Sequence, residues 1–168
     1  MAVPILIAVG LFTTVVQSEP TVRTAGEGAW WQAAWAMARV PSVYWLCMIY
    51  GVTFGGFVGL TSFLPVLLHD QYGSDPIVGG SIAALCGFTG SLIRPVGGYV
   101  ADRWGGLPVL VGVFIALALM TVLAGSLPAL PWATGLLVGT IAVMGFGNGV
   151  IFQIVSEWFP KDIGLASG

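Results

Sequence analysis

The chain has 168 residues, of which 57% are hydrophobic and only 7% are charged, with a formal net charge of −2. Because a soluble domain carries about a quarter of charged residues, this composition excludes a water-exposed globular surface and indicates a protein embedded in the lipid bilayer. The few basic residues form no stripe, which argues against nucleic-acid binding. The 25 glycines suit membrane helices, which pack closely through small residues.

Five apolar segments are long enough to suggest membrane helices. The first, residues 1–17, reaches only about 25 Å, short of a hydrocarbon core of about 30 Å, so we expect it to be the end of a longer helix. It lacks the basic start and the cleavage site of a signal peptide. The other predicted spans are residues 43–68, 77–101, 107–125 and 132–155.

Residues 18–42 separate the first two spans and are predicted to form a loop. Its later part, with Trp30, Trp31 and Trp35, suggests an amphipathic stretch in the headgroup region. The remaining connections, HDQYGSDP, DRWGG and SLPALP, are short, so consecutive helices should be antiparallel neighbours. The sequence therefore predicts an all-α, polytopic helical bundle of about five transmembrane helices in the cell membrane.

The basic residues outside the spans occupy alternate connections: Arg23 and Arg39 lie in the first, Arg103 in the third, and Lys161 follows the last span. Alternation of the spans puts all four on one side of the membrane. The positive-inside rule identifies that side as cytoplasmic.

Arg94 is the one basic residue inside a span, roughly 10 Å from the predicted cytoplasmic end of its helix. Placing a guanidinium there costs at least about 2.5 kcal/mol, and none of the five spans contains an Asp or Glu to offset it. Two interpretations stay open: an arginine that snorkels or bonds to carbonyls, and a cation in a water-filled pathway that awaits an anion. Its planar fork suits a flat oxyanion such as nitrate or nitrite.

Tyr50, Phe54 and Phe57 recur at i, i+4 and i+7 on one helical face, which is either ordinary packing or the wall of a binding slot beside Arg94. A glycine stripe at a spacing of four predicts a close helix contact. It consists of Gly51, Gly55 and Gly59.

The last span contains Gly145-Phe-Gly-Asn-Gly149, which lacks the spacing of a dinucleotide fingerprint. We expect Gly145 and Gly149 to permit close packing. Asn148 and Gln153 are polar groups inside the membrane that need partners, either a neighbouring helix or a file of water. All four are candidates for packing or for lining a pathway.

Cys47 and Cys86 lie in apolar runs and are expected to pack as small hydrophobes. His69, beside Asp70, is expected at the membrane interface. Because the sequence offers no cluster of His, Cys or carboxylate groups for acid–base or metal chemistry, we expect neither an enzyme nor a metal or other cofactor.

The stretch Gly98-x-x-x-Asp102-Arg103-x-Gly105-Gly106 resembles the signature loop of the major facilitator superfamily. In that family the Asp and Arg lock a helix end and the glycines permit a tight turn, which controls rocking between inward-open and outward-open states. The usual basic residues at the end of the motif are missing here, a variant similar to the nitrate/nitrite porter family.

Two further stretches carry this narrower resemblance. CMIYGVTFGGFVGLTSFLP resembles the seventh helix of the nitrate/nitrite porters, in which a tyrosine and a phenylalanine line the anion site; here they are Tyr50 and Phe54. GFGNGVIFQIVSEWFPKDIGLASG resembles the tenth helix and the loop after it. The resemblance implies transport of nitrate or nitrite by alternating access, as exchange or proton-coupled uptake, with Arg94 also in the anion site.

Facilitators consist of two six-helix halves with the substrate between them. By resemblance, residues 1–17 are the end of the sixth helix, residues 18–42 the central cytoplasmic loop, and residues 43–168 the first four helices of the C-terminal half with the following loop. We therefore expect a partial facilitator fold that works with a missing N-terminal half. The alternatives are a facilitator for another small anion or solute, and a small membrane protein with a structural or assembly role.

The positions of the basic residues generate a topology prediction. A cysteine introduced at Ser74 or Ser126 should react with an impermeant thiol reagent outside intact cells, whereas a cysteine at Gly26 should not. The reverse labelling pattern would contradict both the orientation and the number of spans.

Overall fold

The computed structural model describes Trp31, Trp35 and residues 38–126 and 129–159. The chain divides into two compact units, residues 1–35 and 36–168, and every helix with defined bounds lies in the second. Four helical segments are long and apolar enough to cross a membrane, and the described residues include no strand. The predicted all-α membrane bundle is confirmed, and these segments correspond to the last four predicted spans. The predicted span at residues 1–17 lies outside the described residues.

The first described span runs from Pro41 to Tyr72 and contains a turn of π-helix. It consists of α3 (Pro41–Tyr50), the π-helix η1 (Gly51–Gly55) and α4 (Gly56–Tyr72). Inside the π turn the Thr53 hydroxyl is buried and lies 3.3 Å from each of two preceding carbonyl oxygens, those of Ile49 and Tyr50. The span ends at Gly73, whose φ of 62° is the left-handed conformation that commonly closes a helix.

The second span consists of α5 (Pro76–Leu92) and α6 (Arg94–Trp104). The predicted span over residues 77–101 is confirmed as part of one membrane-capable segment, Pro76–Trp104. Its helix is interrupted at Ile93, because Pro95 has no N–H to donate to the carbonyl one turn earlier. Since α6 continues to Trp104, Arg94 lies about 15 Å from its end rather than roughly 10 Å.

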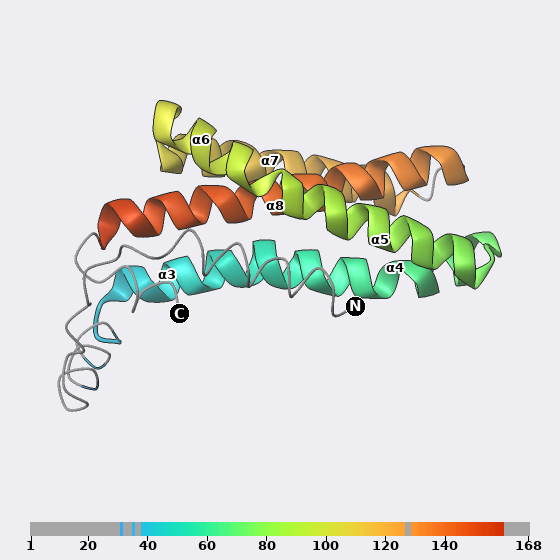
Figure 1. The fold of residues 1–168 in the computed structure, drawn as a ribbon, viewed down its shortest axis with the longest axis horizontal. Coiled ribbons are helices and arrows are strands. Elements are labelled where there is room, and N and C mark those ends of the chain that lie inside the picture. Colours follow the sequence, from blue (N-terminus) through green and yellow to red (C-terminus); the bar gives the residue numbers. More distant parts are fainter. Residues whose placement is uncertain (1–30, 32–34, 36–37, 127–128, 160–168) are drawn as a thin grey trace, which may run out of the picture. The chain divides into compact units, whose positions relative to one another are not determined.

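The last two spans are α7 (Gly106–Gly125) and α8 (Leu130–Trp158). Gly105 alone joins α6 to α7, at a φ of 88° that favours glycine. Helix α8 is the most buried span and contacts α3, η1, α4, α5, α6 and α7. Figure 1 shows α8 between α3 and α4 on one side and α5, α6 and α7 on the other.

Glycines bring α8 into backbone contact with α5 and α6. A Cβ built on Gly145 would overlap the carbonyl of Gly90, and one on Gly149 would overlap the carbonyl of Arg94. On the other side of the α6–α8 contact, a Cβ on Gly97 would overlap the carbonyl of Phe146. These three positions require glycine if the helices are to approach this closely.

The prediction that the glycine stripe of the Pro41–Tyr72 span makes a close helix contact was wrong for the described part of the chain. A Cβ on Gly51, Gly55 or Gly59 would find no atom within 4 Å. The span packs through a different face, on which Phe57, Leu64 and Leu68 are buried.

The two cysteines have different surroundings. Cys86 is fully buried in the cluster that α4, α5 and α8 share, whereas Cys47 is exposed on α3, so the expectation that both pack was wrong for Cys47. Both are free thiols. His69 is exposed near the end of α4, with Nδ1 3.0 Å from the Ser74 carbonyl oxygen.

The described helices alternate in direction. In Figure 1 the start of α3, the α6–α7 junction and the end of α8 lie at one end, and the α4–α5 and α7–α8 connections lie at the other. Arg39 and Arg103 fall at the first of these ends by their place in the chain, and its cytoplasmic assignment stays a prediction. Trp31 and Trp35 are helical and exposed. Trp30, Arg23, Gly26 and Lys161 lie outside the described residues.

The contact between α5 and α8 yields a stability prediction. Gly145→Ala should lower stability by about 1–3 kcal/mol, because the new methyl group must push two backbones apart. Gly135→Ala on the same helix is the matched control, since its Cβ would meet nothing within 4 Å. Thermal unfolding of the detergent-solubilised intact protein measures the difference, and equal melting temperatures would contradict the proposed backbone contact.

Candidate functional site

Arg94 is the first residue of α6 and its side chain faces two aromatic rings. The guanidinium carbon Cζ lies 5.3 Å from the ring centroid of Phe54 and 5.3 Å from that of Phe57. Nε is buried, and within the described part of the chain the guanidinium has no hydrogen-bond or ion-pair partner. Of the two interpretations that the sequence leaves open, this geometry favours the cation that awaits an anion, since the side chain is held by rings rather than by carbonyls.

The rings beside Arg94 form a continuous aromatic wall. Tyr50 and Phe54 stack with centroids 5.1 Å apart and planes 7° apart, and Phe54 stacks on Phe57 at 6.5 Å and 18°. Phe152 of α8 closes the wall, edge-on to Tyr50 at 5.8 Å. The sequence analysis missed Phe152, although its spacing of four from Asn148 places both on one face of the last span.

The π turn gives this wall its geometry. It begins directly after Tyr50 and contains Phe54, so the two rings are separated by a wider turn than an ordinary helix provides. Turns of this kind occur frequently at functional sites. The sequence contains no simple signal for it, because hydrophobic periodicity assumes a regular helix.

A polar depression of about 400 Å³ lies between α6 and α8, with Arg94 at its inner end and Asp102 near the end of α6. The structure thus brings Arg94 together with two residues of the signature loop, Gly98 and Asp102, and with two candidates on α8, Gly149 and Gln153. The lining residues are Arg94, Pro95, Gly98, Asp102, Gly149, Phe152, Gln153 and Ser156.

The signature loop adopts a tight turn. Gly105 makes the turn at positive φ, and Gly106 abuts the side chains of Ile154 and Gln153, where a Cβ would clash. Arg103 donates a long hydrogen bond of 3.4 Å to the Tyr99 hydroxyl. Among the described residues neither Asp102 nor Arg103 forms an ion pair, so the structure does not bring them together as a lock.

Asn148 and Gln153, the two polar candidates on α8, differ in their surroundings. Gln153 lies in the depression, where Nε2 donates to Glu157 at 3.4 Å and Oε1 is buried without a partner. Asn148 is fully buried, and neither atom of its amide has a hydrogen-bond partner within the described ranges. Intramembrane polar groups of this kind point to function.

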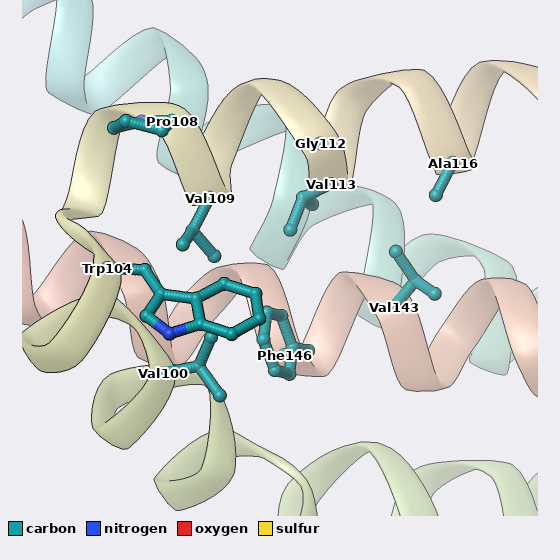
Figure 2. A pocket seen from close by; sticks show the side chains of 9 residues that line it. All are labelled: Val100, Trp104, Pro108, Val109, Gly112, Val113, Ala116, Val143 and Phe146. Atoms are coloured by element: carbon teal, nitrogen blue, oxygen red, sulfur yellow. The ribbon is translucent and has the colours of Figure 1, made fainter.

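A second depression, of about 520 Å³, is larger but apolar. It lies between α6, α7 and α8, and Figure 2 shows the Trp104 indole beside Val100 and Phe146. Because its lining offers only the indole N–H as a polar side-chain group, it does not suit an anion. The lining residues are Val100, Trp104, Pro108, Val109, Gly112, Val113, Ala116, Val143 and Phe146. In the part of the chain that is described, no group of His, Cys, Asp and Glu residues could hold a metal ion.

Comparison with known proteins adds the family context. The chain is 36% identical over 135 residues to the nitrite extrusion protein of Bacillus subtilis, and 31% identical over 133 residues to the probable nitrate transporter NarT of Staphylococcus epidermidis. Each match covers 79% of this chain and 34% of the relative. The probable nitrate/nitrite antiporter NarK1 of Thermus thermophilus is 29% identical over 149 residues, which are 77% of this chain and 34% of that protein.

The chain thus spans about a third of the length of these relatives, which are named as an extrusion protein, a transporter and an antiporter. No solved structure matches it. The family model of the Major Facilitator Superfamily matches residues 1–168. Together with the four apolar spans, this match shows that the chain is a multi-pass plasma-membrane protein that belongs to the major facilitator superfamily.

Proposed function

We propose that this chain is part of a transporter, not an enzyme, that moves nitrate or nitrite across the membrane and holds the anion at Arg94. The main support is a guanidinium inside a membrane-capable span that lies against aromatic rings and has no carboxylate partner among the described residues. The names of the relatives supply the substrate class. An N-terminal half from the rest of the transporter would complete the site.

The surroundings of Arg94 suit a small anion for an energetic reason. An unpaired cation in hydrocarbon is costly, and two cation–π contacts return about 0.5–2 kcal/mol each. Phe54 and Phe57 contact the face of the guanidinium and do not accept its N–H groups. These N–H groups can therefore donate to a ligand in the depression. A flat oxyanion accepts two such bonds in the plane of the fork, whereas a lysine would offer only a point charge.

The depression links the proposed anion site to the signature loop. Arg94, Gly98 and Asp102 follow one another at intervals of four on α6, so they share the face that looks into the depression. A shift of α6 against α8 would therefore change the space around Arg94 and the position of Asp102 together. This arrangement supports alternating access, in which Gly98, Asp102, Arg103, Gly105 and Gly106 control the conformational step.

The role of Arg94 is tested by Arg94→Lys in the intact transporter. Nitrate affinity should fall about ten- to a hundredfold, which corresponds to the loss of one hydrogen bond to a charged group. Phe54→Ala should weaken binding less and widen anion selectivity, because the wall would lose one ring. Nitrate binding to purified protein of equal insertion is the measurement, with Arg39→Lys as the control arginine outside the site. Near-normal affinity of Arg94→Lys would show that Arg94 is structural.

The role of the signature loop is tested by Asp102→Asn. If Asp102 biases a conformational equilibrium without touching the substrate, the substitution should slow nitrate exchange in proteoliposomes several-fold and change equilibrium affinity much less. A large loss of affinity with unchanged maximal exchange would instead place Asp102 in the binding site and contradict the gating role.

A further inference from the structure

Asn148 lies on α8 between two elements that carry the anion site. On one side of it, a Cβ on Gly147 would come within 3.3 Å of the Thr53 side chain of η1. On the other side, Gly149 abuts the backbone of Arg94 at the start of α6. Asn148 therefore occupies the point at which α8 meets both η1 and α6.

The neighbours of Asn148 on its own helical face show what it faces. Met144 and Phe152, one turn before and one turn after it, share this face of α8. Met144 packs against Gly56, the residue that directly follows η1. The ring of Phe152 lies edge-on to the ring of Tyr50, the residue that directly precedes η1. Since the two flanking residues meet the two ends of the π turn, Asn148 faces the turn itself, which carries Phe54.

Several buried polar atoms around this point have no hydrogen-bond partner within the described residues. Asn148 is fully buried, and its Nδ2 and Oδ1 have no partner within the described residues; the same holds for Nε of Arg94. Nδ2 and Nε are donors that lack an acceptor, and the unpaired acceptors nearby on α8 are Oδ1 of the same amide and the buried Oε1 of Gln153. Buried amides are rarely left unpaired, and such an exception calls for a functional reason. An oxyanion, which only accepts hydrogen bonds, would supply the missing acceptors.

We infer that Asn148 is a further anion-binding residue of this site. Its Nδ2 donates to the same planar oxyanion that Arg94 holds. The inference rests on the proposed function, because it assigns a second contact to the same anion. Gln153, the other polar candidate on α8, donates to Glu157, has an unpaired Oε1, and contributes to the depression farther toward the end of the helix.

Asn148→Leu in the intact transporter separates binding from structure. Nitrate affinity should fall about ten- to a hundredfold, as expected for a lost hydrogen bond to a charged group. The melting temperature without anion should stay the same or rise, because an unpaired amide is replaced by an apolar side chain of similar volume. Thr140→Val is the matched control: Thr140 is buried on α8 and bonds to the Leu136 carbonyl at 2.8 Å, so the change should leave nitrate affinity unaltered.

Asn148→Asp is the second variant, and it stays informative if the leucine variant does not insert. A carboxylate facing Arg94 should pair with the guanidinium, abolish the nitrate-induced rise in melting temperature, and stabilise the protein without anion. A nitrate response of wild-type strength in either Asn148 variant, with a normal response in the wild type, would overturn the assignment of Asn148 alone. Absence of any nitrate response in the wild-type transporter would overturn the proposed function and this inference with it.

Discussion

A guanidinium inside an apolar membrane span must be compensated, and the arrangement of the described helices around Arg94 is consistent with this constraint. Phe54 and Phe57 place two ring faces at 5.3 Å from the guanidinium carbon, which returns part of the lost hydration. The rings leave the charge itself uncancelled. A site that is partly stabilised in this way and still positive is suited to an anion that must bind and leave again.

Local chain chemistry sets the position of this charge. Pro95 interrupts the second span at Ile93, so Arg94 begins a new helix segment inside the span instead of continuing a regular helix. Gly149 lets α8 touch the backbone of Arg94, and Gly97 lets α6 touch Phe146. Proline, arginine and glycine therefore act together: the break, the charge and the close contact occur within one turn of α6.

Under the proposed function, the same contact would relate substrate binding to movement. Helix α8 carries Phe152 and Asn148 toward η1 and Gly149 toward α6, so it contacts both the aromatic wall and the arginine. The depression continues along α6 to Asp102, one residue before the arginine of the signature loop. A protein that must couple an occupied site to helix movement benefits from having both on a single pair of packed helices.

The sequence predicted the spans well because their apolar length is a local property, and the family motif because it is contiguous. Whether a face is packed is not local: the stripe at Gly51 is open, whereas Gly97, which no pattern distinguished, lies at backbone contact. The sequence analysis did not predict the π turn or the break at Ile93, because hydrophobic periodicity assumes a regular helix. Pro95 was a visible signal for the break. Phe152 escaped because its partner, Tyr50, lies in another span.

The most direct measurement of the central claim is a structure of the intact transporter determined in the presence of nitrate. The account predicts density for a planar anion within hydrogen-bonding distance of the Arg94 guanidinium, beside the ring of Phe54. It would be contradicted by a carboxylate from the rest of the transporter paired with Arg94, or by anion density bound only at a site that Arg94 does not touch.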